Sequence, residues 1–192
     1  MKKEIRIIDS KKIYSGDISF RLDKYHLKNK IIKKEVVEHL PSVGIIPIFK
    51  NDLIVFVSQY RHAIGKTILE IPAGGIERGE IPQEAAVREM AEEIGCTGKI
   101  YPMLRLYLAP GYDTEIMDVF IATNLKKIER GNLDDDEDIE IRRMKVSTAI
   151  KKCLNGEIQD CKTIAALLAY AKISEYNHGK IFNRSKRIAF SS

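Results

Sequence analysis

The chain has 192 residues, of which 44% are hydrophobic and 31% are charged. These fractions are ordinary for a globular protein, and the length suits one full core with a small appended element. The formal net charge of +5 is modest. A net positive charge of this size does not establish nucleic-acid binding, and the sequence contains no nucleic-acid-binding motif. We therefore expect no nucleic-acid partner.

The sequence also disfavours a membrane protein and a protein stabilised by disulfide bonds. No apolar run approaches the length of a membrane span, and the N-terminus lacks the apolar region of a signal peptide. The cysteines, Cys96, Cys153 and Cys161, form neither a metal-ligand spacing nor an even disulfide set. We therefore expect a cytoplasmic protein with no membrane partner.

The first half of the chain is predicted to be mainly strands. Residues 4–37 alternate apolar and polar residues and are interrupted at 15–17 and 29–30, which is typical of strands joined by turns. Residues 43–49 and 53–60 are rich in strand-forming residues, and the polar segment between them predicts a hairpin.

A helix is predicted between Pro82 and Gly95. Proline suits the first position of a helix, and glycine suits the residue just beyond its end. One face of this helix is apolar by its spacing and is expected to pack on the core. The residues of that face are Val87, Met90, Ala91 and Ile94.

The remaining secondary structure alternates strands with helices. Residues 100–108 and 116–123 are predicted strands, and residues 144–154 and 162–174 are predicted helices. An apolar stripe is expected along the last helix. That stripe is formed by Ile164, Leu167, Leu168 and Ala171.

Three glutamates, Glu89, Glu92 and Glu93, lie on the opposite side of the 82–94 helix within a sector of roughly 100 degrees. A solvated helix face is one interpretation. The other is a metal site, because like charges at this spacing repel unless a cation compensates them. The preceding 71–75 segment ends in two glycines, which allow close approach of the backbone. Oxygen ligands of this kind suit Mg²⁺ or Mn²⁺ better than zinc.

The segment from Gly74 to Cys96 resembles the Nudix box, in which a glycine, five residues, a glutamate and seven residues precede REUxEExGU, where U is apolar. All invariant positions are filled here, by Gly74, Glu80, Arg88, Glu89, Glu92, Glu93 and Gly95. Cys96 takes the last apolar position, where a cysteine can pack. The resemblance implies hydrolysis of a nucleoside diphosphate linked to another group.

The flanking residues resemble the ADP-ribose pyrophosphatase branch of this superfamily. Its motifs are matched by QYR at 59–61, LEIPAG at 69–74 and APGYDTE at 109–115, and also by NGEIQD at 155–160 with the following Lys162 and Thr163. The resemblance extends from about residue 10 to about residue 172.

The resemblance implies roles for individual residues. The Ala73 carbonyl, Glu89, Glu92 and Glu93 would bind the metal, and Glu92 would also assist catalysis or hold the loop through Arg88. Arg61 would contact a substrate phosphate or the terminal ribose, since its planar fork binds oxyanions in pairs. The remaining contacts, on the ribose side of the pocket, would come from Pro110, Gly111 and Glu115.

The acidic run at 134–140 has two interpretations. Such a composition usually forms a solvated loop. In the resembling branch, a loop at this place supplies a glutamate that orients or deprotonates the attacking water, and Glu137 matches that position best. Neighbouring acidic residues could substitute for it.

The predicted fold is an α/β Nudix fold, with a mixed β-sheet sandwiched between helices and a small N-terminal antiparallel sheet. The expected division is an N-terminal sheet element at 1–40 that is exchanged in a homodimer, a hydrolase domain at 41–178 and a basic tail at 179–192. The expected activity is Mg²⁺-dependent hydrolysis of ADP-ribose to AMP and ribose 5-phosphate, with Mn²⁺ as a substitute metal. The alternatives are hydrolysis of another nucleotide sugar, such as GDP-mannose or ADP-glucose, and a non-catalytic nucleotide-sensing module.

Overall fold

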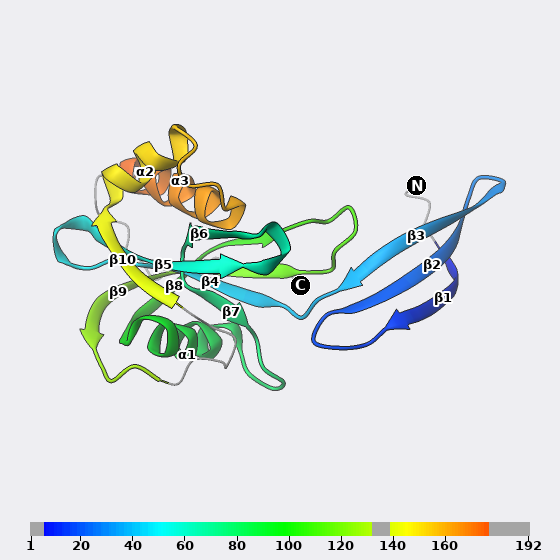
Figure 1. Cartoon of the computed structure of the whole chain (residues 1–192), viewed down its shortest axis with the longest axis horizontal. Helices are drawn as coiled ribbons and strands as arrows, with labels where there is room; N and C mark the ends of the chain where they lie inside the picture. Colours follow the sequence, from blue (N-terminus) through cyan, green and yellow to red (C-terminus); the bar gives the residue numbers. More distant parts are fainter. Residues whose placement is uncertain (1–5, 132–138, 177–192) are drawn as a thin grey trace. The chain divides into compact units, whose positions relative to one another are not determined.

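The structure is a computed structural model that describes residues 6–131 and 139–176. The chain divides into two compact units (Figure 1). The first comprises Met1–Pro41 with Tyr107–Ile116, and the second comprises Ser42–Leu106 with Met117–Ser192. The predicted division into an N-terminal element at 1–40 and a hydrolase domain at 41–178 stays a prediction. The predicted tail at 179–192 lies outside the described residues.

The first unit contains an antiparallel sheet of three strands. In their spatial order these strands are β1 (Ile7–Tyr14), β2 (Ser19–Leu27) and β3 (Lys30–Glu38). The 107–116 loop is hydrogen-bonded to β3, because Val37 N–H donates to the Tyr112 carbonyl at 2.8 Å and Thr114 N–H donates to the Val37 carbonyl at 3.1 Å. The predicted small N-terminal antiparallel sheet is confirmed.

The second unit contains two sheets. One has the order β7-β4-β9-β8, in which β4 and β9 are parallel and β4 and β7 are antiparallel, and the other has the order β10-β5-β6 with antiparallel pairing. The strands are β4 (Ser42–Pro47), β5 (Leu53–Arg61), β6 (Lys66–Glu70), β7 (Ala73–Gly75), β8 (Cys96–Tyr107), β9 (Ile116–Lys127) and β10 (Ile139–Lys145).

The hairpin predicted for residues 43–60 is only partly formed. The turn holds the 3₁₀ helix η1 (Lys50–Asp52), and beside it one isolated antiparallel bridge joins Ile48 to Ile54. Beyond that bridge β4 and β5 enter different sheets. A second 3₁₀ helix, η2 (His62–Ile64), follows β5.

Helices cover both sides of these strands. Figure 1 shows α1 (Pro82–Ile94) on one side and α2 (Val146–Leu154) with α3 (Cys161–Tyr176) on the other. This arrangement confirms the predicted α/β sandwich. None of the helices in the described ranges is both long and apolar enough to span a membrane, and the cytoplasmic location stays a prediction.

The buried faces of two helices differ from the predicted stripes. On α1, Met90 and Ile94 are buried as predicted, whereas Val87 and Ala91 are only half-buried. The rest of the buried face consists of Ala85, Ala86, Glu89 and Glu93. On α3 the buried residues are Thr163, Ala166, Leu167 and Tyr170, and the predicted core residue Leu168 is exposed.

Candidate active site

Helix α1 holds most of the candidate catalytic residues, and local sequence sets both of its ends. Pro82 occupies the first turn, where its missing N–H would have no helical partner. Gly95 adopts a left-handed conformation with φ of 60°, and its N–H donates to the Ala91 carbonyl. The helix therefore presents Glu89, Glu92 and Glu93 at a fixed spacing.

Glu89 and Glu93 are buried against the backbone of β7, with exposed fractions of 9% and 2%. The Ala73 N–H donates to Glu93 Oε2 at 3.0 Å. A Cβ placed on Gly74 would lie 2.0 Å from Glu89 Oε1, so only glycine allows this approach. Two buried carboxylates thus lie against the backbone at Ala73 and Gly74, on the side of the helix opposite the predicted apolar stripe.

Arg88 pairs with the surrounding carboxylates. Its Nη1 donates to Glu89 Oε1 at 2.8 Å and to Glu92 Oε2 at 3.0 Å. Its Nε donates to Glu80 Oε1 at 3.0 Å, and its Nη2 donates to the Gly75 carbonyl at 2.8 Å. The hydrogen bond from Arg88 holds the pKa of Glu80 below its usual range. Arg88 therefore ties the glycine loop to the helix.

The donors near Ala73 fit a hard divalent cation by their chemistry, because they are carboxylate and backbone oxygens. They do not form a complete ligand set in the described ranges, where no group of three or more His, Cys, Asp or Glu side chains is placed to hold an ion. Glu92 is turned toward Arg88, and Glu137 lies outside the described residues. The assignment of Ala73, Glu89, Glu92 and Glu93 as ligands stays a prediction.

Arg61 lies at the end of β5 and is held by Glu70 of β6. Its Nε donates to Glu70 Oε1 at 2.7 Å and its Nη2 donates to Glu70 Oε2 at 2.9 Å, a bidentate pair. This hydrogen bonding raises the pKa of the Arg61 guanidinium, and the negative charges of Glu93 and Asp160 act in the same direction. Arg61 therefore lies within electrostatic reach of Glu93.

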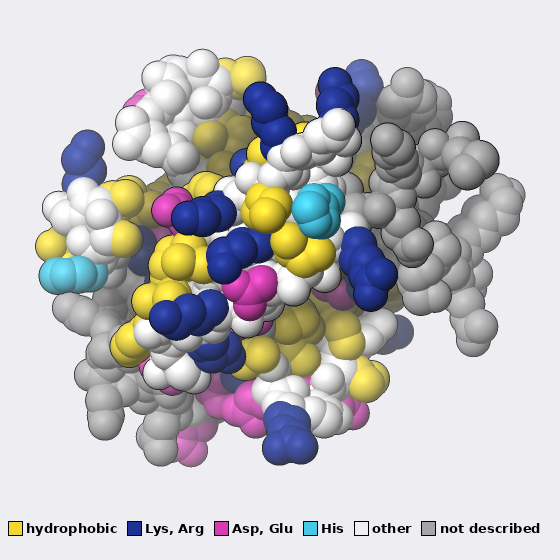
Figure 2. Space-filling view, turned by 90° about the vertical axis from the view of Figure 1, so that its right-hand side faces the viewer, with side chains coloured by type: hydrophobic (Ala, Val, Ile, Leu, Met, Phe, Trp, Pro, Cys, Tyr) yellow, Lys and Arg dark blue, Asp and Glu magenta, His cyan; other side chains and the backbone are white. Residues whose placement is uncertain are grey.

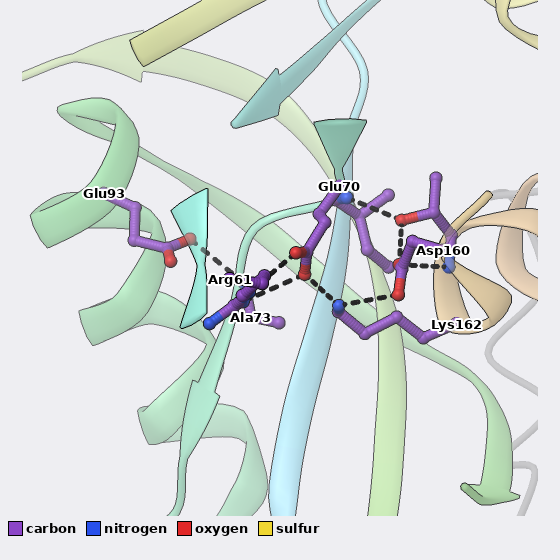
Figure 3. A network of polar contacts seen from close by, with 8 residues as sticks. Arg61, Glu70, Ala73, Glu93, Asp160 and Lys162 are labelled. Atoms are coloured by element: carbon purple, nitrogen blue, oxygen red, sulfur yellow. Dashed lines mark hydrogen bonds and ion pairs between the residues drawn. The ribbon is translucent and has the colours of Figure 1, made fainter. Parts of the chain in front are cut away.

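Glu70 and Lys162 are site residues whose role the sequence did not reveal. Lys162 donates to Glu70 and, at 3.0 Å, to Asp160 (Figure 3). Both positions fall within motifs that resemble the ADP-ribose pyrophosphatase branch, so the signal was present. No sequence motif indicates, however, that these two residues, 92 positions apart, pair with each other.

The predicted ribose-side residues belong to the first unit. Pro110 and Gly111 are exposed and Glu115 is half-buried in the loop between β8 and β9. The Glu115 N–H donates to Asp113 Oδ1 at 2.9 Å, and the Glu115 carboxylate lies 3.9 Å from His39 Nδ1. The role of these residues in substrate binding stays a prediction.

The NUDIX domain family matches this chain over residues 38–167. The chain belongs to the NUDIX family. This confirms the resemblance of the box from Gly74 to Cys96, and members of the family generally use divalent metal ions.

Comparison with individual NUDIX proteins extends the match to most of the chain. An ADP-ribose pyrophosphatase of Bacillus subtilis is 35% identical over 176 residues, which cover 90% of this chain and 95% of that protein. A methanol dehydrogenase activator of Bacillus methanolicus is 33% identical over 177 residues, which cover 90% of this chain and 95% of that protein. A solved structure described as an ADP compounds hydrolase superposes with a TM-score of 0.81 and 20% identity, over 92% of this chain and 97% of that one. The last comparison supports the fold.

Proposed function

We propose that this protein is a Mg²⁺-dependent ADP-ribose pyrophosphatase that hydrolyses ADP-ribose to AMP and ribose 5-phosphate. The observation that carries the proposal is the burial of Glu89 and Glu93 against the Ala73 and Gly74 backbone, within a complete Nudix box. Carboxylate and backbone oxygens grouped in this way are the ligands that hard divalent cations prefer, which favours a metal-binding role. The flanking motifs and the B. subtilis relative support ADP-ribose as the substrate.

Each candidate residue has a role in this proposal. The Ala73 carbonyl, Glu89 and Glu93 hold the metal, and Glu92 assists with a further ion or through Arg88. When bound, Mg²⁺, or Mn²⁺ in its place, offsets the phosphate charge and acidifies an attacking water. Glu137 accepts a proton from that water, and Arg61 binds a phosphate oxygen. The other substrate contacts come from Pro110, Gly111 and Glu115.

Product analysis tests the proposed reaction. The purified protein would be incubated with ADP-ribose and Mg²⁺, and the products separated by anion-exchange chromatography. Equimolar AMP and ribose 5-phosphate, formed only with a divalent ion, would support the proposal. Absence of turnover with ADP-ribose and with other nucleotide sugars would contradict it and would favour the nucleotide-sensing alternative.

A homodimer is the assembly that the first unit supports best. None of its hydrophobic side chains in the described residues is buried, and every residue of β1 is exposed. Large hydrophobic residues instead lie at the surface, and Figure 2 shows apolar side chains among Lys and Arg side chains on the face that includes this sheet. A three-stranded sheet without a covered apolar face is marginally stable. A second copy of the chain would cover it.

A further inference from the structure

A buried group of charged side chains lies behind Arg61. Glu70 is 1% exposed and is bound by two cations, Arg61 and Lys162. Lys162 also pairs with Asp160 at 3.0 Å, and its side chain is 11% exposed. Two carboxylates are therefore matched by two cations. Figure 3 shows this chain of contacts from Asp160 through Lys162 and Glu70 to Arg61.

The same group anchors the backbone that leads to the candidate metal site. Asp160 Oδ2 accepts hydrogen bonds from the Thr163 N–H at 3.0 Å and from Thr163 Oγ1 at 2.5 Å. Thr163 Oγ1 in turn accepts the Ile71 N–H at 2.8 Å. Ile71 lies two residues before Ala73. The start of α3 thus fixes both Arg61 and the entry to β7.

The hydrogen bonds of Arg61 leave one edge of its guanidinium available. Nε and Nη2 face Glu70, whereas Nη1 has no hydrogen-bond acceptor among residues 6–131 and 139–176. The side chain is 40% exposed. The direction of this available edge depends on how firmly Glu70 is held, because a bidentate pair fixes the plane of the guanidinium.

We propose that Lys162 is a positioning residue for substrate binding, which acts through Glu70 to aim the Nη1 edge of Arg61 at a phosphate oxygen of the nucleotide sugar. The inference rests on the proposed function. Without the Lys162 charge, Glu70 and Asp160 would share the single cation Arg61. The guanidinium would then be drawn away from its bidentate alignment with Glu70. Lys162 would affect binding without contacting the substrate.

A double-mutant cycle tests this coupling. Lys162→Met should raise KM for ADP-ribose about tenfold, which corresponds to about 1.4 kcal/mol, and change kcat much less. In the Arg61→Ala background the same substitution should have almost no further effect, and Lys162→Arg should restore most of the binding. Equal loss of kcat/KM in both backgrounds would overturn the proposal, because it would indicate a purely structural role. Lys172→Met, an exposed position on the same helix, is the matched control.

A spectroscopic measurement tests the positioning independently of turnover. The Arg61 Nε–H resonance, assigned by its loss in Arg61→Ala, should exchange slowly with solvent in the wild type and faster in Lys162→Met. An unchanged exchange rate would overturn the proposal. If Lys162→Met does not fold, Lys162→Gln, which also removes the charge, takes its place in both experiments. A wild-type protein that hydrolyses no nucleotide sugar would refute the proposed function, while the exchange measurement would still decide whether Lys162 orients Arg61.

Discussion

Gly74 and Glu89 occupy adjoining space, so that a single added methyl group would meet the carboxylate: a Cβ at Gly74 would lie 2.0 Å from Glu89 Oε1 and 2.3 Å from Oε2. The Gly74 backbone lines one side of the site, and the buried Glu89 carboxylate lines the other. Neither group can move aside for an added methyl group without displacing the candidate ligands. The glycine is therefore part of the site.

Gly74→Ala should displace Glu89 and weaken the response to Mg²⁺. We expect kcat/KM to fall at least about 100-fold, a loss of about 2.7 kcal/mol in transition-state stabilisation. Gly75→Ala is the matched control, because a Cβ there meets nothing within 4 Å. Steady-state kinetics over a Mg²⁺ titration measures both variants. Equal activity of the two would show that Glu89 is not needed where the structure places it.

Glu93→Gln should lower turnover by orders of magnitude while the fold is kept. The amide retains the size of the side chain and can still accept the Ala73 N–H, but it loses the negative charge that would bind the metal. Glu84→Gln, at an exposed glutamate in the first turn of α1, is the control. Near-normal turnover of Glu93→Gln with Mg²⁺ would refute its assignment as a ligand.

The acid sensitivity of folding should depend on Glu70. Burial opposes its ionisation, but hydrogen bonding to Arg61 and the charge of Lys162 outweigh this and lower its pKa. A lowered pKa in the folded state stabilises the protein at neutral pH, and this contribution is lost as pH falls below about 4 to 5 and through the folded-state value.

Glu70→Gln should therefore be less stable than the wild type near pH 7, and its free energy of unfolding should vary less as the pH falls below about 5. Urea denaturation across pH 3 to 7 measures this difference. Glu175→Gln, an exposed position on α3, is the control. If the wild type and Glu70→Gln lost stability in parallel on acidification, the ion pairs of Glu70 would contribute nothing.

Dimerisation should depend on the apolar side chains of the first unit. Ile7 and Ile31 are 52% and 58% exposed, and replacing both with lysine should shift the protein toward monomer, because buried apolar contacts would be replaced by charges. Leu154→Lys, at a position 73% exposed at the end of α2, is the control. Sedimentation velocity distinguishes the species. A wild-type protein that sediments as a monomer at all concentrations would contradict the prediction.

The parts of the fold that were predictable depend on local signals. Pro82 and Gly95 act on their own backbone, so the helix between them was predicted to the residue. The strands and turns of the first unit follow from alternation and turn residues in the same way. The spacing of the Nudix box is also local, because it lies on one loop and one helix.

The parts that were not predictable depend on distant contacts. Periodicity placed Glu89 and Glu93 on a polar face, and only the approach of β7 buries them. The division of β4 and β5 between two sheets depends on their partners β9 and β10, which come later in the chain. The pairing of Glu70 with Lys162 joins residues 92 positions apart, and no local pattern specifies which charges meet.

The most direct test of the central claim is kcat/KM for a panel of ADP-ribose, ADP-glucose, GDP-mannose, NADH and diadenosine polyphosphates, measured with Mg²⁺. The proposed function predicts that ADP-ribose has the highest value, with AMP released. A higher value for another member of the panel would keep the pyrophosphatase chemistry and contradict the assignment of ADP-ribose as the substrate.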